Sequence, residues 1–142
     1  MESRHRPEDS FGLARKVGIK SGQAVCLLNA PGDVLASLAR QSKGVRFSTS
    51  LGDGRYDIII FWPARSAELA RFAELQSRVS PDGAIWAVIP KKHFAQRRGV
   101  DFTWEDMQAA ALETDLDDNK VVSVSDEEYA TRFVIRKSRR HY

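Results

Sequence analysis

The segment that most constrains the fold is residues 23–33, an apolar run that leads into a tight turn. Its first half predicts a buried strand, and the apolar residues Val34, Leu35 and Leu38 follow at helical spacing. Pro31 suits the first turn of that helix, because its missing N–H would have no partner there. A strand, a turn and a helix in this order are typical of the start of a nucleotide-binding α/β domain.

The rest of the chain continues the alternation of strands and helices. A continuous apolar run at 56–62 indicates a strand that is covered on both faces, as in parallel sheets. The predicted strands are 24–28, 45–49, 56–62, 84–89, 120–125 and 130–137, and the predicted helices are 10–16, 31–41, 67–78 and 104–113. We therefore expect a three-layer Rossmann-like α/β fold. Its mostly parallel sheet of about six strands ends in a C-terminal antiparallel hairpin.

The length of 142 residues fits one domain. We predict a flexible N-terminal tail over 1–9, a single Rossmann-like domain over 10–137 and a basic C-terminal tail over 138–142. The N-terminus lacks the apolar stretch of a signal peptide, and no apolar run is long enough to span a membrane. These features predict a cytoplasmic protein that has no membrane partner. The single cysteine, Cys26, lies among apolar residues and is interpreted as a small buried hydrophobe.

Polar side chains follow several strands of the predicted sheet at the edge where ligands bind in open α/β folds. They are Asn29, Trp62, Arg65, Lys91, Lys92 and His93. Together they predict a basic rim that suits a small anionic ligand, such as a phosphate or a carboxylate. The alternative is that they are solvated loop residues with no shared role.

Other candidate sites carry weaker signals. Asp117 and Asp118 could ligate a divalent cation, but a turn rich in Asp and Asn explains the pair without a metal, and we predict no metal site. No motif for nucleophilic catalysis is present, so no catalytic residue is assigned. Trp104, if exposed, would mark a contact surface or a lid. The sheet edge or the terminal hairpin could pair with a protein partner or a second copy.

Three segments resemble a shortened class I methyltransferase. They are residues 56–60, residues 75–90, which contain Ser80-Pro81-Asp82-Gly83, and the closing hairpin. More closely, the chain resembles a bacterial family of uncharacterised proteins, the domain-of-unknown-function family 3052. That resemblance covers about residues 10–137 and is carried by the segments 16–22, 27–31, 89–92 and 118–121. It implies a methyltransferase-like Rossmann fold rather than an activity.

The chain departs from the methyltransferase pattern in two places. The turn after the first strand has Ala30 and Pro31 where those enzymes have a glycine-rich loop that approaches S-adenosylmethionine. The second strand ends in Ser48-Thr49-Ser50, where an acidic residue usually holds the ribose; Asp53 lies a few residues beyond. We therefore predict a domain without a cofactor and without methyl transfer, which acts as a binding or regulatory module.

Two alternatives remain open at the level of the sequence. The chain could be a divergent S-adenosylmethionine-dependent methyltransferase in which Asn29 and Asp53 still hold the cofactor. It could also be a nucleic-acid-associated protein that uses the basic residues 136–141. The net charge of +3 and the lack of aromatic residues among those cations make nucleic acid the less favoured partner.

Overall fold

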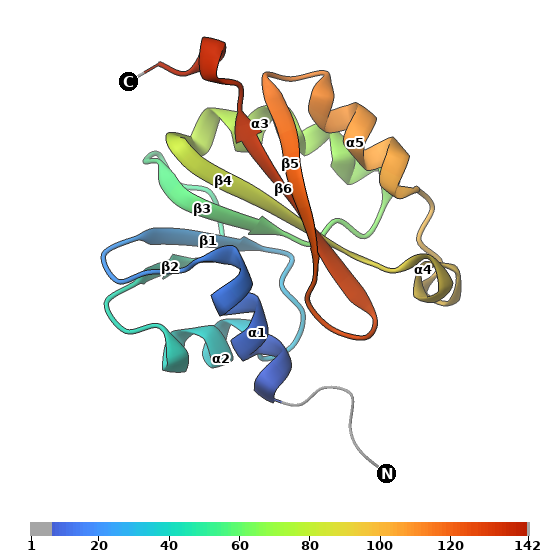
Figure 1. Ribbon diagram of the computed structural model, residues 1–142, viewed down its shortest axis with the longest axis horizontal. Helices are drawn as coiled ribbons and strands as arrows, with labels where there is room; N and C mark the ends of the chain where they lie inside the picture. Colours follow the sequence, from blue (N-terminus) through green and yellow to red (C-terminus); the bar gives the residue numbers. More distant parts are fainter. Residues whose placement is uncertain (1–6, 142) are drawn as a thin grey trace.

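The computed structural model describes residues 7–141 as a six-stranded sheet with helices on both faces (Figure 1). The elements are α1 (Pro7–Val17), β1 (Ala24–Leu28), α2 (Val34–Gln41), β2 (Arg46–Ser48), β3 (Tyr56–Phe61), the 3-10 helix η1 (Ser66–Arg71), α3 (Phe72–Arg78), β4 (Val79–Pro90), α4 (Lys92–Arg98), α5 (Trp104–Leu112), β5 (Leu116–Ser123), β6 (Glu128–Ile135) and the 3-10 helix η2 (Lys137–Arg139). Within the described residues, no helix is long and apolar enough to cross a membrane.

The strand order is β2-β1-β3-β4-β6-β5. Strands β1 to β4 are parallel, β6 runs antiparallel to β4, and β5 runs antiparallel to β6. This arrangement confirms the predicted Rossmann-like sheet and its C-terminal hairpin. From β1 the chain passes to β2 on one side and then returns to β3 on the other side. The carboxyl end of β1 is therefore the point at which the direction of strand addition reverses.

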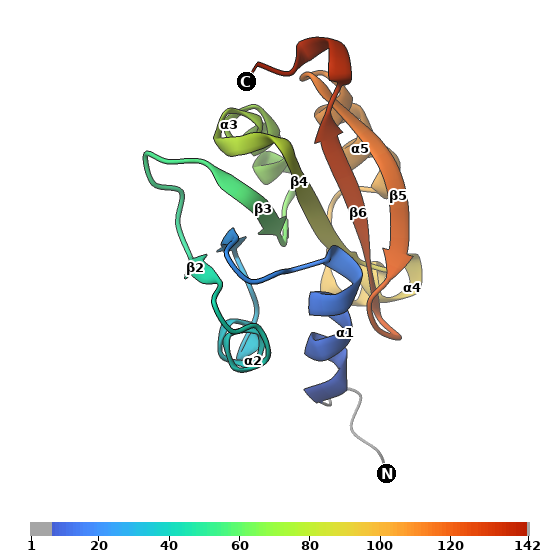
Figure 2. The ribbon, with the colours of Figure 1, turned by 60° about the vertical axis from the view of Figure 1, so that its left-hand side comes forward.

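Alternate residues of the central strands bury their side chains in two separate cores. Helices α1 and α2 cover one face, where Leu27, Ile60 and Trp86 pack. Helices α3 and α5, with η1, cover the other face, where Phe61, Phe72 and Phe133 pack. Figure 2 shows α1 and α2 on one side of the sheet and α3 and α5 on the other. Burial on both faces explains why β3 reads as an unbroken apolar run.

The ends of several elements differ from the predictions. Residues 7–9, predicted as tail, belong to α1, and Pro7 suits the first turn of a helix; residues 1–6 lie outside the described part. Helix α2 begins at Val34, so Pro31 stands in the turn before it. The predicted helix 67–78 is a 3-10 turn followed by α3. The predicted C-terminal tail contains part of η2, and Arg140 Nε donates to the Ile135 carbonyl at 2.8 Å.

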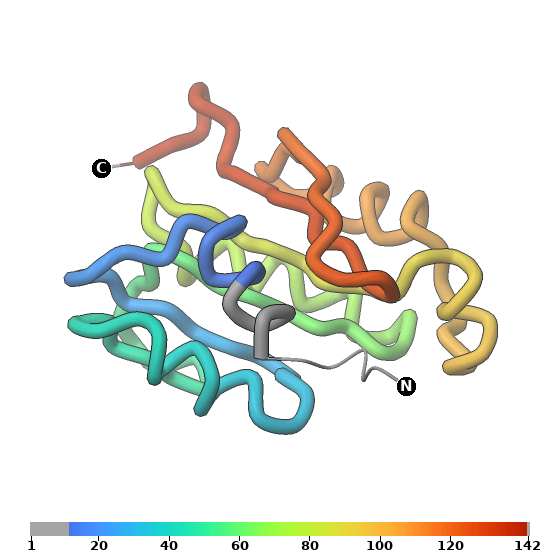
Figure 3. Tube along the Cα trace, turned by 60° about the horizontal axis from the view of Figure 1, so that its bottom comes forward, coloured from blue at the N-terminus to red at the C-terminus, as the bar shows by residue number. Residues whose placement is uncertain are grey.

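Two segments that lay outside the predicted helices and strands form elements of their own or extend one. Residues 92–98 form α4, which stands beyond the carboxyl end of β4 beside the β5–β6 turn (Figures 1 and 3). Arg98 ties α4 to that turn through Glu127 at 2.8 Å and Glu128 at 3.0 Å. Residues 117–119, predicted as a turn before a strand that starts at Lys120, lie within β5. Asp117 pairs with Arg136 at 3.0 Å, and Asp118 Oδ1 accepts from Gln108 Nε2 at 3.2 Å.

The predicted turn at 80–83 is a bulge inside β4. Tyr56 pairs with Val79 and Ile58 pairs with Ala84, so the ladder skips the four residues between them. A Cβ on Gly83 would lie 2.5 Å from the Asp57 carbonyl oxygen and 3.0 Å from Val79 Cγ2. Glycine is required here because the backbone of β3 comes too close for any side chain.

We predict that Gly83→Ala destabilises the protein by ~1–3 kcal/mol, because the new methyl group overlaps backbone atoms that cannot move aside cheaply. Chemical denaturation would measure this loss. Gly54→Ala is the matched control, since a Cβ on Gly54 meets no atom within 4 Å. Equal stability of the two variants would contradict the close approach of β3 and β4.

Candidate functional site

The carboxyl end of β1 is followed by two residues with left-handed backbone, Asn29 at φ 64° and Gly32 at φ 47°. Asn29 is the one non-glycine residue with positive φ in the described part of the chain. Asparagine and glycine tolerate this conformation better than other residues. A Cβ on Gly32 would meet nothing within 4 Å, so the backbone of the turn is open to a ligand.

Helix α2 starts directly after this turn. Its N-cap residue, Asp33, makes no side-chain hydrogen bond to the first turn of the helix. The amide groups at a helix N-terminus carry partial positive charge and favour negatively charged groups. The turn and the helix start together offer backbone donors at the reversal point of the sheet.

Glu68 in η1 links the loops that follow β1 and β3. Its Oε1 accepts from the amides of Ala64 at 2.7 Å and Arg65 at 3.0 Å, and its Oε2 accepts from Asn29 Nδ2 at 2.8 Å. Desolvation opposes ionisation of Glu68, but these hydrogen bonds and the nearby charge of Arg71 lower its pKa. A carboxylate therefore stands beside Asn29 at neutral pH.

A second carboxylate holds the next residues of the same loop. Asp101, which lies before α5, accepts from the Ser66 amide at 2.7 Å and from Ser66 Oγ at 3.0 Å. These two hydrogen bonds, helped by the charge of Arg65, lower the pKa of Asp101. The loop after β3 is thus fixed from both sides, by Glu68 and by Asp101.

The six predicted rim residues do not gather at one place. Asn29 and Arg65 meet at Glu68, as described above. Trp62 is 7% exposed and packs in the core beneath α1 and α2. Lys91 Nζ donates to Ser123 Oγ at 2.8 Å, at the β5–β6 hairpin, and Lys16 Nζ donates to the Ser123 carbonyl.

The other two rim residues lie on α4. Lys92 and His93 are exposed there, and His93 Nε2 lies 3.2 Å from Arg97 Nη2. Cations thus border the carboxyl edge on the β4 side, while the carboxylates of Glu68 and Asp101 border it beside β3. The anionic ligand of the rim stays a prediction.

Asp53 lies at the opposite edge of the sheet from Asn29. Arg78, the residue before β4, donates from Nη1 to the Asp53 carbonyl at 2.8 Å. Asp53 therefore stands near the amino ends of β3 and β4 and cannot act as a displaced ribose anchor. The end of β2 offers only the hydroxyl groups of Ser48, Thr49 and Ser50.

Two further residues singled out in the sequence have structural roles. Cys26 is fully buried, and this burial raises its pKa to about 11 despite the charge of Arg71, so it is a neutral thiol in the core. Trp104 is half-buried rather than exposed, and its Nε1 donates to the buried Thr131 Oγ1 at 2.8 Å. The exposed ring on which the lid or contact-surface interpretation depended is therefore not found.

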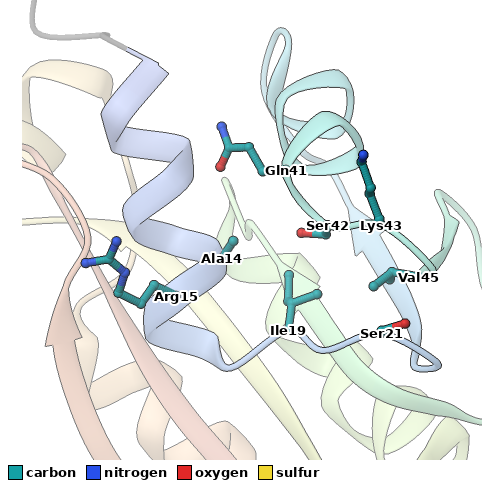
Figure 4. Close-up of a pocket in the computed structure, with 8 residues that line it drawn as sticks. All are labelled: Ala14, Arg15, Ile19, Ser21, Gln41, Ser42, Lys43 and Val45. Atoms are coloured by element: carbon teal, nitrogen blue, oxygen red, sulfur yellow. The ribbon is translucent and has the colours of Figure 1, made fainter.

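A separate cavity of about 260 Å³ lies between the ends of α1 and α2 (Figure 4). Ile19, Ser21, Lys43 and Val45 line it, and they belong to the segments that lead into β1 and β2. The cavity is therefore at the amino edge, away from Asn29, and Figure 4 shows Arg15 pointing away from the other lining residues. We place the candidate site at the carboxyl edge, because strand ends and helix N-termini converge there.

Sequence reasoning missed Glu68 and Asp101. The signal for Glu68 was its position three residues after Arg65, where an acidic side chain reaches back to the amide at the start of a helix. Asp101 lies 35 residues from Ser66, and no local pattern joins them.

No family model matches this sequence, and no curated protein matches it. Solved structures share its fold. An S-adenosylmethionine-dependent methyltransferase from Aquifex aeolicus has a TM-score of 0.71 at 13% identity, over 90% of each chain. One from Clostridium acetobutylicum has a TM-score of 0.64 at 8% identity, over 91% of this chain and 90% of that one. The CcbJ methyltransferase from Streptomyces caelestis has a TM-score of 0.63 at 10% identity, over 92% and 90%.

These neighbours overturn our leading interpretation of the sequence, a domain without methyl transfer that acts as a binding or regulatory module. They favour the alternative, a divergent methyltransferase. The error came from the assumption that a turn with a single glycine cannot let its backbone approach a ligand. Asn29 supplies a second left-handed position in this turn. The chain has the Rossmann-like fold of S-adenosylmethionine-dependent methyltransferases.

Proposed function

We propose that the protein is an S-adenosylmethionine-dependent methyltransferase. The observation that carries the proposal is the carboxyl edge of β1, where the left-handed residues Asn29 and Gly32 precede the N-terminus of α2 and face the ionised Glu68. The fold of the neighbouring structures supports the same assignment. The order of strands puts the reversal point, where such folds bind their ligands, at this edge.

The residues at this edge fit the chemical groups of the cofactor. S-adenosylmethionine carries a carboxylate, for which the amides at the start of α2 are suitable donors. Its ammonium and sulfonium groups are positive, and Glu68 is the carboxylate that lies beside Asn29. Its ribose has two hydroxyl groups, which the hydroxyls of Ser48, Thr49 and Ser50 can meet in place of the usual carboxylate. The ends of β1, β2 and β3 thus offer a partner for each of these groups: backbone amides, a carboxylate and hydroxyls.

When bound, the cofactor supplies a methyl group activated by its sulfonium. The chain contributes positioning. Glu68 fixes the loops after β1 and β3 to each other, and Asp101 fixes Ser66 in the second of these loops. Loops held in this way keep the binding groups in one arrangement, which lowers the entropy that binding must remove.

Several finer inferences from the sequence accompany this proposal. We retain a cytoplasmic location as a proposal, and we infer that the protein is of bacterial type, as its resemblance to the domain-of-unknown-function family 3052 implies. We also retain a protein partner or a second copy as a proposal, because β2 and β5 are the edge strands of the sheet. Fractionation of the native host and light scattering of the purified protein would test location and assembly.

Isothermal titration with S-adenosylmethionine and S-adenosylhomocysteine should give saturable heat. The protein concentration must be high enough to detect dissociation constants in the high micromolar range, because the ribose lacks a carboxylate partner. The absence of heat with both compounds would contradict the proposal. Saturable binding would justify a search for methyl acceptors.

Glu68→Gln should weaken S-adenosylmethionine binding by about tenfold, because it removes the negative charge that faces the cofactor. Glu74→Gln is the matched control. Glu74 lies in the next helix, α3, and the substitution removes only its exposed ion pair with Arg71. If the two variants bind equally well, Glu68 does not face the ligand.

Asn29→Gly and Asn29→Ala separate the amide from the backbone. Glycine keeps the left-handed conformation and loses only the contact with Glu68, whereas alanine also adds about 1–2 kcal/mol of backbone strain. We expect both variants to bind S-adenosylmethionine more weakly and only the alanine variant to show a clear loss of melting temperature. Unchanged affinity in both would assign Asn29 a purely structural role.

A further inference from the structure

Three side chains form a row across β4, β6 and β5, on the face that α1 and α2 cover elsewhere. Trp86 is the direct cross-strand partner of Arg132, and Arg132 is the direct partner of Lys120. Directly opposite residues project to the same side of a sheet. Trp86 packs in the core on this face, and Lys120 Nζ lies 5.9 Å from the centre of its ring. The three residues are called the Trp86–Arg132–Lys120 row.

The row contains donors and lacks acceptors. Trp86 is 1% exposed, and its Nε1 is buried with no hydrogen-bond partner. Within residues 7–141, no acceptor receives a hydrogen bond from the guanidinium of Arg132 or the ammonium of Lys120. Like charges that stand directly opposite each other destabilise a sheet, and a buried N–H without a partner costs further free energy. The cation–π contact of Lys120 with the Trp86 ring offsets part of the first cost, and within the described residues no acceptor offsets the second.

The charges around the row add to the imbalance. Burial, and then the charge of Arg140, lower the pKa of Arg132. The carboxylates of Asp82 and Asp117 each form an ion pair with an arginine outside the row. Asp82 Oδ1 is 3.9 Å from Arg140 Nη1, and Asp117 pairs with Arg136 at 3.0 Å. Neither carboxylate neutralises Arg132 or Lys120.

The face is accessible at this row. Ala130 of β6 is buried in the core that contains residues of α1 and α2, whereas several other side chains of β5 and β6 on this face reach solvent. Lys120 is exposed, and Arg132, Val122 and Val134 are half-buried. A small ligand can therefore approach the two cations, while the buried indole of Trp86 lies beneath them.

We propose that the Trp86–Arg132–Lys120 row binds a phosphate group. A phosphate dianion neutralises two adjacent cations, which a single carboxylate does not. Its oxygens can accept two parallel hydrogen bonds from the guanidinium of Arg132 and, at the same time, a hydrogen bond from the ammonium of Lys120. The site is on a helix-covered face of the sheet, not at its carboxyl edge, and it requires no cofactor. The phosphate site can be tested independently of the proposed methyltransferase activity.

Titration with inorganic phosphate tests the site, in a buffer alkaline enough for the dianion and at constant ionic strength. The readouts are the melting temperature and tryptophan fluorescence, which should change as Lys120 moves relative to the indole of Trp86. We expect saturable binding that is at least about tenfold stronger than that of acetate. Arg132→Gln and Lys120→Gln should each weaken it by about tenfold. Arg55→Gln, which removes an exposed cation from the loop before β3, should leave it unchanged.

Folding of the variants is checked without phosphate. Because Arg132→Gln removes a like charge opposite Lys120, its melting temperature without phosphate should be equal to or higher than that of the parent. Trp86→Phe should abolish the fluorescence change and keep the phosphate-dependent rise in melting temperature. Binding that is absent, as weak as that of acetate, or equally reduced in Arg55→Gln would overturn the proposal. A parallel titration with methyl phosphate shows whether the site prefers the free ion or a phosphate carried on a larger molecule.

Discussion

The central strands β1 and β3 bury both of their faces, and this requirement organises the molecule. A strand with two apolar faces is stable only with a layer on each side, so the connections must supply those layers. Helices α1 and α2 supply one, and η1, α3 and α5 supply the other. The link from β2 to β3 contains no helix, and its Leu51 packs on the second core. The sheet therefore gains a strand beside β1 without an additional helix.

The same topology places polar groups at one edge. Since β1, β2 and β3 are parallel, the loops that follow them emerge together, and Glu68 joins two of them. Its three hydrogen bonds come from two backbone amides and one side-chain amide, a combination that holds a carboxylate ionised. The edge consequently combines backbone donors near α2 with a fixed negative charge near Asn29. A ligand with both an anionic and a cationic end matches it better than a simple anion does.

The sequence predicted what depends on local pattern. Strands β1 and β3 were predicted correctly, because a strand that is buried on both faces is a continuous run of apolar residues in the sequence. Helix α4 escaped prediction because none of its residues is buried, and because it is held by Arg98 on Glu127 and Glu128, about thirty residues away. The bulge at Gly83 looked like a turn, since the reason for the glycine is the Asp57 carbonyl of another strand.

The site was harder to predict because its key contacts join distant segments. The basic rim was inferred from the residues that end each strand, yet Trp62 turns into the core and Lys91 turns toward Ser123. The direction of a side chain after a strand depends on its neighbours in space, which the order of residues does not give. Counting glycines misled for a related reason. What a ligand-binding turn needs is backbone that adopts positive φ and leaves room for approach, and Asn29 with Gly32 meets that need with one glycine. The conformation is the requirement, and residue identity is only its usual marker.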